Sequence, residues 1–575
     1  MDNQITEKVN KWLSGNYDEA TKTAIKVLQD GDEKLLQEAF YKNLEFGTGG
    51  LRGVIGVGSN RVNKYTIGMA TQGFANYLNQ SFPKPVSVAI AYDSRNNSKE
   101  LANITANVFA ANDMKVYLFE DLRPTPELSF AIRHLGCQGG VVLTASHNPK
   151  EYNGYKAYWD DGAQLVPPHD KNVISEVEKI TDVNDVKWTG GEHNIEIIGK
   201  EIDDVYINMV KGLSIYPDII KEQSDLKIVF TPIHGTGIKL VPAALKAFGF
   251  TNVTVVEEQS TPDGNFPTVE YPNPEERETM RIGLEKAKAI DADILLGTDP
   301  DADRVGVGVK NNKGEWILLN GNQTAMMAFT YIMEARNNKG IAGENDMVVK
   351  TIVTTNMIDK IAAANDVKCY NVLTGFKWIS SLIKEKEGKE NYVVGGEESF
   401  GLMIGNEVRD KDAVSAVALI CEMAAVERSK GKTLYDKLIE LSVEHGLYLE
   451  DLISITKKGM DGAQQIADMM EESRNNPPKE IVSVKVKQLL DYEKQEGKNL
   501  LTGESFKIEL PKSNVLQYIL EDDTVISARP SGTEPKIKYY FSVNKSIASA
   551  DDFDDGMKEL AQKIVNIQNE LGLKK

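Results

Sequence analysis

The feature that most constrains this chain is a recurring pattern in which a short apolar strand ends in a polar loop. Its clearest instance is the run Gly139–Leu143, opened by two glycines, which predicts a buried strand. The loop Thr144–Pro149 follows, with the sequence Thr-Ala-Ser-His-Asn-Pro. Because α/β proteins place their chemistry at such strand ends, Ser146 is expected to be held firmly and to face outward. The alternative is that Ser146 and Asn148 only shape a turn.

The same pattern recurs along the chain and predicts an α/β fold. A strand over Val86–Tyr92, a helix over 98–112 and a strand over Lys115–Phe119 precede the serine strand. With 575 residues, the chain has room for roughly three to five domains. We expect four, which are residues 1–204 with an N-terminal helical extension, 205–321, 322–450, and a C-terminal domain over 451–575.

Composition excludes several classes of protein. The net charge of −19 argues against a nucleic-acid-binding protein, which would carry a basic surface. The three cysteines are far apart and odd in number, so neither a disulfide framework nor a cysteine metal site is expected. We also expect no signal peptide and no membrane span. These features together predict a cytoplasmic protein.

A second polar loop carries three carboxylates. The predicted strand Ala292–Gly297 ends in Thr298–Arg304, where Asp299, Asp301 and Asp303 alternate with other residues. Ionised carboxylates so close together repel unless a cation neutralises them. An EF-hand for Ca²⁺ is ruled out because Arg304 and Lys310 stand where that motif needs Gly and Glu. Hard oxygen ligands with open positions favour Mg²⁺; a solvated acidic turn is the alternative.

Two further loops favour recognition of a phosphorylated sugar. Gly395–Gly401 contains Glu397 and Ser399, which can hydrogen-bond adjacent sugar hydroxyls. Near the C-terminus, Arg529–Lys536 has the sequence Arg-Pro-Ser-Gly-Thr-Glu-Pro-Lys and combines a guanidinium, hydroxyls and an exposed glycine amide, which suit a phosphate. Taken alone, each could be an ordinary turn.

Cations elsewhere in the sequence could serve the same anion. Arg52 lies among four glycines in Phe46–Gly53, which predicts a mobile, anion-contacting loop or a plain turn cluster. Lys156 follows Ser146 by ten residues, close enough to share a pocket, although a single lysine is usually a solvated surface charge. Lys377 lies in the glycine-containing loop 374–378.

Several local signals predict helix starts. Asp32 is expected to cap a helix within the N-terminal extension. Asn273-Pro274-Glu275-Glu276 predicts another start, with Met280, Leu284 and Ala287 as the apolar stripe. The run 409–412, Arg-Asp-Lys-Asp, is interpreted as a salt-bridged helix start. Residues 451–500 are charged and mixed, and no structure is assigned to them.

The four loops in this order resemble the α-D-phosphohexomutase family, on its phosphoglucomutase branch. The resemblance rests on Thr-Ala-Ser-His-Asn-Pro, Asp-Pro-Asp-Ala-Asp-Arg, Gly-Glu-Glu-Ser and Arg-Pro-Ser-Gly-Thr-Glu-Pro, and it spans most of the chain. It implies a heart-shaped arrangement of three related α/β domains and a smaller C-terminal α+β domain around a central cleft. It also implies a phosphoserine, one Mg²⁺ per chain, and glucose 1,6-bisphosphate as activator and intermediate.

The resemblance also implies a role for each matched residue. Ser146 would be the phosphorylated serine, and Asp299, Asp301 and Asp303 would bind Mg²⁺ together with an oxygen of the Ser146 phosphate. The remaining matched residues fall into groups around the reacting phosphoryl group (Arg52, His147, Lys156 as candidate acid or base, and Arg304 nearby) and around the sugar and its other phosphate (Lys377, Glu397, Ser399, Arg529, Ser531, Gly532, Thr533). Phe400-Gly401 departs from the Gly-His of some branches and leaves the sugar open.

The implied reaction is the interconversion of glucose 1-phosphate and glucose 6-phosphate by a monomer or weak dimer that binds sugar phosphates. Mannose or pentose phosphates, or a bisphosphate synthase using the same serine, are alternatives on the same scaffold. An aspartyl-phosphate metal phosphatase with Asp299 as nucleophile is an alternative from another class. An inactive sugar-phosphate-binding protein is a third.

Overall fold

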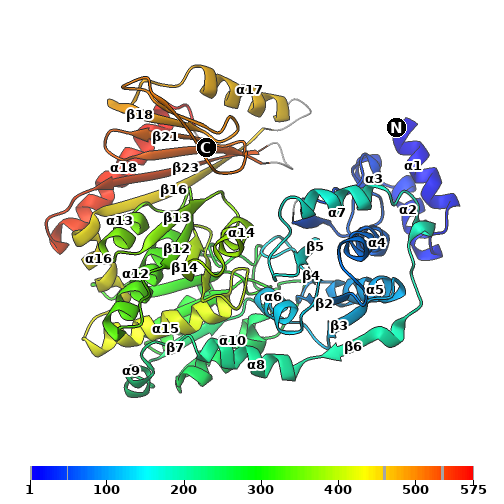
Figure 1. Cartoon of the computed structure of the whole chain (residues 1–575), viewed down its shortest axis with the longest axis horizontal. Helices are drawn as coiled ribbons and strands as arrows, with labels where there is room; N and C mark the ends of the chain where they lie inside the picture. Colours follow the sequence, from blue (N-terminus) through cyan, green and yellow to red (C-terminus); the bar gives the residue numbers. More distant parts are fainter. Residues whose placement is uncertain (1–2, 48, 458–461, 532–535, 574–575) are drawn as a thin grey trace. The chain divides into compact units, whose positions relative to one another are not determined.

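The computed structural model describes residues 3–47, 49–457, 462–531 and 536–573. The chain divides into two units. Unit 1 comprises Met1–Gly321, Phe376–Gly395 and Ser399–Gly431, and unit 2 comprises Asn322–Gly375, Gly396–Glu398 and Lys432–Lys575. Helices and strands alternate through most of the chain, which confirms the predicted α/β class (Figure 1).

Unit 1 opens with three short helices, α1 (Asn3–Ser14), α2 (Glu19–Asp30) and α3 (Glu33–Phe40). Asp32 caps α3 as predicted, accepting hydrogen bonds from the backbone N–H groups of Lys34 and Leu35. An aromatic cluster joins this extension to the rest of the unit. In it Trp12 stacks on Tyr17 at 4.3 Å between ring centroids, and both rings meet Tyr65 of α4 (Lys64–Ser81).

The first sheet of unit 1 has the strand order β1-β5-β4-β2-β3-β6. Its strands β4, β2, β3 and β6 run parallel, whereas β5 is antiparallel to both β4 and β1. The bounds of these strands are β1 Gly50–Val54, β2 Ser87–Tyr92, β3 Lys115–Phe119, β4 Gly139–Leu143, β5 Tyr152–Trp159 and β6 Ile195–Ile198. The expectation of a mobile loop around Arg52 is therefore wrong, because residues Gly50–Val54 form strand β1 and pair with β5.

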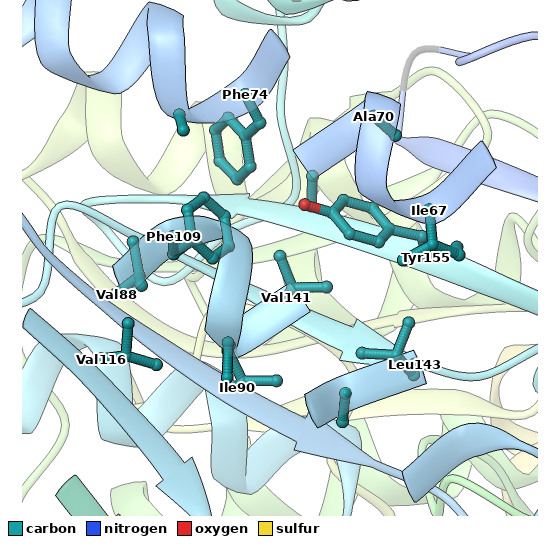
Figure 2. Packing of buried hydrophobic residues seen from close by; sticks show 14 of the residues in the cluster. Ile67, Ala70, Phe74, Val88, Ile90, Phe109, Val116, Val141, Leu143 and Tyr155 are labelled. Carbon is teal, nitrogen blue, oxygen red and sulfur yellow. The ribbon is translucent and has the colours of Figure 1, made fainter. Parts of the chain in front are cut away.

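Helices cover both faces of this sheet. A Cβ on Gly139 would meet Phe74 of α4, and one on Gly140 would meet Ile132 of α6 (Thr125–His134), so α4 and α6 lie on opposite faces. With α4, the helices α5 (Ser98–Ala111) and α7 (His169–Glu178) complete one core. Figure 2 shows Phe74 and Phe109 over the strand residues Val88, Ile90 and Val141 of this core.

The second sheet of unit 1 has the order β11-β10-β9-β7-β8, in which β8, β7 and β9 are parallel and β10 pairs antiparallel with both β9 and β11. Its strands are β7 Ile228–Thr231, β8 Val253–Val255, β9 Ile294–Thr298, β10 Val305–Lys310 and β11 Trp316–Leu319. The accompanying helices of unit 1 are α8 Lys200–Lys211, α9 Pro217–Glu222, α10 Gly237–Phe248, α11 Arg281–Ala289, α14 Phe376–Lys386 and α15 Ala413–Ser429, with strand β15 at Gly401–Ile404.

The helix start predicted at Asn273 is wrong, because α11 begins at Arg281. The expected stripe is buried nonetheless, with Met280, Leu284 and Ala287 in the core. Residues 273–280 form turns, in which the Thr279 hydroxyl donates to the Tyr271 carbonyl. Glu275 pairs with Arg304, the last residue of Thr298–Arg304, which we call the carboxylate loop. Those tertiary partners keep the segment out of the helix.

Unit 2 combines a parallel strand pair with a large antiparallel sheet. Strands β12 (Asp346–Thr351) and β13 (Lys368–Val372) pair in parallel, and β14 (Asn391–Glu397) ends in this unit. The antiparallel sheet has the order β16-β23-β22-β21-β18-β19-β20, with β17 paired to β18. Its strands are β16 Leu447–Thr456, β17 Glu480–Ile481, β18 Val484–Asp491, β19 Glu496–Asn499, β20 Ser505–Lys507, β21 Leu516–Leu520, β22 Val525–Pro530 and β23 Lys536–Lys545.

The helices of unit 2 are α12 Gly321–Lys339, α13 Met357–Ala364, α16 Leu434–His445, α17 Gly462–Asn475 and α18 Phe553–Glu570. The described part of residues 451–500, to which the sequence analysis assigns no structure, thus forms the end of β16, α17 and three strands of the antiparallel sheet. The short 3-10 turns η1 (Val183–Asp185), η2 (Glu192–Asn194), η3 (Glu257–Gln259) and η4 (Ala550–Asp552) complete the chain. Within the described ranges, every helix is too short or too polar to cross a membrane.

Candidate active site

Ser146 lies three residues beyond β4 in a tightly bonded loop. Its backbone N–H donates to the Thr144 hydroxyl oxygen at 2.8 Å, and that hydroxyl donates to Asp93 at 2.6 Å. The Ser146 φ of 53° is in the left-handed region, where a residue other than glycine needs support from its surroundings. The side chain is buried, with 3% exposure, so the expectation that it faces outward is wrong. It faces the carboxylate loop of the same unit instead.

The Ser146 hydroxyl has two polar neighbours. It donates to Oδ2 of Asp299 at 2.9 Å, and it lies 3.1 Å from Nδ1 of His147. Loss of solvation, followed by the positive charges of Arg304 and Arg52, lowers the pKa of His147 well below its ordinary value. A neutral imidazole beside the hydroxyl can accept or donate a hydrogen bond without adding charge.

The three aspartates converge at the end of β9. One ligand oxygen from each of Asp299, Asp301 and Asp303 lies within 4.8 Å of the others, and all three side chains are buried. Oδ1 of Asp299 accepts the backbone N–H groups of Asp303 and Arg304, both at 3.0 Å, which curls the loop around this carboxylate. The predicted metal ligands are thus brought together at one point.

Two of the three carboxylates, Asp299 and Asp303, differ in their electrostatics. Burial raises the pKa of Asp299 well above its ordinary value, and repulsion from Asp301 and Asp303 adds to the effect. Burial also acts to raise the pKa of Asp303, but the positive charges of Lys156, Lys411 and Arg304 prevail and lower it. The site therefore concentrates negative charge on the side of Asp303.

Two lysines balance that charge. Lys156 donates to Oδ2 of Asp301 at 2.7 Å and to Oδ2 of Asp303 at 3.0 Å. Burial alone would lower the pKa of Lys156, but the two aspartates outweigh it and raise the pKa. Nζ of Lys411 lies 3.4 Å from Oδ2 of Asp303.

Lys411 is a residue that sequence reasoning missed. The run 409–412 does start a helix, since Asp412 caps α15 by accepting the N–H groups of Val414 and Ser415. The sequence feature that could have identified Lys411 is the helix after it, α15, whose apolar residues lie on all sides and which is therefore buried. A lysine directly before a buried helix needs a carboxylate partner, and the carboxylate loop supplies one.

The predicted arginines lie at the edge of this cluster. Arg52 on β1 donates to the Asn148 side-chain oxygen at 3.3 Å, and so contacts the loop that carries Ser146. Arg304 pairs with Glu275 at 2.5 Å, and its Nε lies 3.9 Å from Asp303. Both guanidinium groups thus contact the loops that carry Ser146 and the three aspartates.

The other predicted site residues are described separately in the two units. In unit 1, Lys377 is the second residue of α14, with Nζ over the Trp378 ring, and Ser399 is half-buried. In unit 2, Glu397 ends β14 and is buried, and Arg529 lies on β22, paired in register with Lys538. The Ser531 N–H donates to the Lys536 carbonyl at 2.7 Å.

Three further residues belong to the predicted sugar and phosphate loops. Gly532 and Thr533 lie outside the described residues. The carboxylate of Glu398, next to Glu397, accepts the hydroxyls of Thr351 at 3.0 Å and Thr354 at 3.3 Å. Burial, together with the charge of Glu397, raises the pKa of Glu398 to about 7.

Comparison with known proteins agrees with this arrangement. Three models of the phosphoglucomutase/phosphomannomutase family match the chain, namely α/β/α domain I over residues 43–184, domain II over 204–314 and domain III over 320–442. A phosphoglucomutase of Staphylococcus aureus is 37% identical over 556 residues, which cover 96% of this chain and 97% of that protein. One from Staphylococcus epidermidis is 38% identical over 533 residues, covering 92% and 94%.

Solved structures share the fold. A putative phosphomannomutase from Thermus thermophilus superposes with a TM-score of 0.66 at 21% identity, covering 91% of this chain and 99% of its own. Parafusin, a phosphoglucomutase from Paramecium, superposes with a TM-score of 0.68 at 18% identity, covering 92% and 96%. The matches to the three family domains and the identity over nearly the full length show that this chain is an enzyme, an isomerase, of the phosphoglucomutase/phosphomannomutase family.

Proposed function

We propose that this enzyme is a phosphoglucomutase that interconverts glucose 1-phosphate and glucose 6-phosphate through a phosphorylated Ser146 and glucose 1,6-bisphosphate. The observation that carries the proposal is the 2.9 Å hydrogen bond from the Ser146 hydroxyl to Asp299, within a buried triad of aspartates flanked by two lysines. Full-length relatives that bear the name phosphoglucomutase support the choice of reaction.

The residues of the triad suit Mg²⁺. Oδ1 of Asp301 and Oδ1 of Asp303 are buried without a hydrogen-bond partner among the described residues, which is costly unless a cation binds them. Asp299, Asp301 and Asp303 would hold the ion with an oxygen of the Ser146 phosphate, and carboxylate oxygens are the ligands that Mg²⁺ prefers. When bound, the ion would withdraw charge from the phosphoryl oxygens.

The side chains around Ser146 account for the transfer itself. The P–O bond to Ser146 breaks while a new P–O bond forms to the 6-hydroxyl oxygen of glucose 1-phosphate. The 6-hydroxyl of the sugar gives up a proton, and the Ser146 oxygen takes one up as it is released. Lys156 is the candidate relay, because its ammonium, held by Asp301 and Asp303, can donate a proton to the Ser146 oxygen and the resulting amine can accept the proton of the sugar hydroxyl. Transfer in this class depends mainly on positioning and charge neutralisation, which Arg52, Arg304 and Lys411 would supply.

The second half-reaction reverses the first on the other end of the sugar. Glucose 1,6-bisphosphate turns over, its 1-phosphate returns to Ser146, and glucose 6-phosphate leaves. Glu397 and Ser399 would hold the sugar 3- and 4-hydroxyls in either orientation. Arg529 and Ser531, with Gly532 and Thr533, would grip the phosphate that is not being transferred.

The structure does not favour the phosphatase alternative. Both oxygens of Asp299 are occupied, one by two backbone N–H groups and the other by the Ser146 hydroxyl. A carboxylate bonded in this way is a poor nucleophile, whereas the serine hydroxyl beside it is one proton transfer from attack.

A coupled assay tests the proposal. Wild type, Ser146→Ala and the control Ser260→Ala are given glucose 1-phosphate with Mg²⁺ and a trace of glucose 1,6-bisphosphate, and glucose 6-phosphate is measured. Wild type and Ser260→Ala should be active and Ser146→Ala inactive. Mannose 1-phosphate and ribose 1-phosphate run in parallel, and a preference for either would replace glucose as the substrate. Free phosphate from Ser146→Ala would overturn the serine mechanism.

A further inference from the structure

The loop that carries Ser146 closes around a buried guanidinium. Arg95, three residues beyond β2, donates through Nη1 to the carbonyl oxygens of Pro149 at 2.8 Å and Tyr152 at 3.1 Å. Through Nη2 it donates to the carbonyls of Ser146 and Asn148. Three of the acceptors belong to the segment between β4 and β5, and the fourth, Tyr152, is the first residue of β5, so one side chain gathers the backbone from Ser146 to the start of β5.

The guanidinium uses its Nη groups for the loop, whereas its buried Nε makes an ion pair with Asp93 but no hydrogen bond within the described residues. Its four Nη hydrogens match the four carbonyls, and Nε lies 3.3 Å from Oδ2 of Asp93. The same Asp93 oxygen accepts the Thr144 hydroxyl, which in turn accepts the Ser146 N–H. Arg95 is only 3% exposed. Arg95 and Asp93 thus hold Ser146 from both of its backbone groups.

The flat face of Arg95 contacts the segment 263–266, which lies between η3 and α11 of unit 1. Cζ lies 5.1 Å from the centre of the Phe266 ring, and Phe266 is buried with 1% exposure. The neighbouring backbones are also in close contact, because a Cβ on Gly264 would come within 2.3 Å of the Asn96 nitrogen. The amide of Asn96 donates to the Asn265 side-chain oxygen at 3.1 Å.

The segment around Phe266 connects in turn to the carboxylate loop. The Asp263 N–H donates to the His234 carbonyl, and the Thr236 N–H donates to the Pro300 carbonyl at 2.8 Å. Pro300 lies between Asp299 and Asp301. Continuous contacts therefore run from the serine loop through Arg95 and Phe266 to the backbone of the metal-binding triad.

We infer that Arg95 is a positioning residue that sets the Ser146 loop against the carboxylate loop, so that the serine oxygen meets Asp299 in the geometry needed for phosphoryl transfer. The inference rests on the proposed function. Lysine cannot take this role, because an ammonium has three donors in a tetrahedral arrangement and no flat face for Phe266. Arg95 touches neither the reacting oxygen nor a carboxylate of the triad, and it acts through the loop backbone.

The test compares Arg95→Lys with Arg133→Lys, a control arginine of the same unit that donates to the single carbonyl of Asp161. Three quantities are measured, which are kcat and KM for glucose 1-phosphate, the stoichiometry of phosphoserine formed from glucose 1,6-bisphosphate, and amide hydrogen exchange of the 144–152 peptide. Arg95→Lys should lower kcat by about 10–100-fold, since small misplacements of reacting groups cost that much, with KM within about twofold. Exchange in the 144–152 peptide should rise, and Arg133→Lys should change none of the three.

Wild-type kcat and wild-type exchange in Arg95→Lys would overturn the inference. If Arg95→Lys does not fold, Phe266→Leu decides, because it leaves the four carbonyl bonds and removes only the ring. A fall in kcat of several-fold is expected, and an unchanged kcat would overturn the link between the two loops. Hydrogen exchange does not depend on catalysis. A wild type without mutase activity whose loop still loosens in Arg95→Lys would therefore refute the proposed function and leave the structural role of Arg95 standing.

Discussion

Tyr158 donates a 2.7 Å hydrogen bond to Asp410, although the two residues are 252 positions apart. The same carboxylate accepts the Gln164 amide at 2.8 Å and the Lys411 ammonium at 3.2 Å. Tyr158 follows Lys156 by two residues on β5, so both side chains point to the same face of the sheet. One strand therefore orients both lysines, Lys156 directly and Lys411 through Asp410.

Asp410→Asn should lower kcat by about 10–100-fold, because an amide holds the Lys411 ammonium less firmly and a misplaced cation neutralises the phosphoryl group poorly. Steady-state kinetics on glucose 1-phosphate measures the effect. Asp160→Asn, which removes an exposed partner of Lys384, is the matched control and should keep wild-type kcat. Equal kcat values in the two variants would contradict a role for Asp410.

Removal of divalent cations should abolish activity, and Mg²⁺ should restore it. Asp301→Asn should weaken Mg²⁺ binding by at least about 10-fold, since changes merely next to metal ligands already cost that much. Isothermal titration of each variant with Mg²⁺ gives the affinity. The control is Asp293→Asn, an exposed residue directly before β9, the strand that leads into the triad; this variant should bind Mg²⁺ like wild type. Wild-type affinity in Asp301→Asn would show that the triad is not the metal site.

Gly235→Ala should reduce both metal affinity and kcat, because the new Cβ would lie 2.5 Å from Cα of Pro300 and push the carboxylate loop. Overpacking of this kind costs about 1–3 kcal/mol in the free energy of unfolding. Thermal unfolding and Mg²⁺ titration measure the two effects. Gly212→Ala, whose Cβ would have 3.2 Å to its nearest neighbour, serves as the control and should bind Mg²⁺ normally.

Thermal stability should fall between pH 5 and pH 8 partly because of Glu450, which lies on β16 in unit 2. Burial raises its pKa to about 7, although Thr355, Ser542 and Lys350 act to lower it. A raised pKa means that the folded state binds the proton more tightly than the unfolded state. The resulting stabilisation is complete below pH about 4.5 and is lost as the pH rises through about 7.

Glu450→Gln lacks this titration, so its melting temperature should decline less over the same pH interval. Between pH 5 and pH 8, the fall in melting temperature should be about 2–4 °C smaller in Glu450→Gln than in wild type, the change that 1 kcal/mol makes in a domain of 150–250 residues. Glu480→Gln, at an exposed position, should follow the wild-type curve. Parallel curves for wild type and Glu450→Gln would assign the pH dependence to other groups.

Local pattern was enough to predict the strands and loops that build the site. The strand over Lys115–Phe119 and the strand before Ser146 have the predicted bounds, because unbroken apolar runs between turn residues have few other conformations. The Ser146 and aspartate loops could be predicted to hold chemistry for the same reason, since both follow buried strands. Their closeness to each other came only from the family resemblance.

What the sequence could not supply depends on contacts between distant residues. The buried helix that follows Lys411 indicates that this lysine needs a carboxylate partner, but the local sequence does not show that the partner is Asp303. The helix start expected at Asn273 was overridden by partners such as Arg304 and Tyr271. Arg95 follows the predicted strand Val86–Tyr92, and nothing in the local sequence singles it out. Its importance comes from four carbonyls more than 50 positions away, which no periodicity in the sequence reveals.

The antiparallel pairing of β4 and β5 also limits how this chain can change in evolution or engineering. Lys156 lies opposite Val142 in that pairing, so the residues between the strands act as a spacer of set length. One inserted or deleted residue that slipped the register would turn the ammonium to the opposite face of the sheet, although every residue of the active site was still present. For this enzyme, the number of residues between Ser146 and Lys156 must therefore stay constant, just as the two residues themselves must.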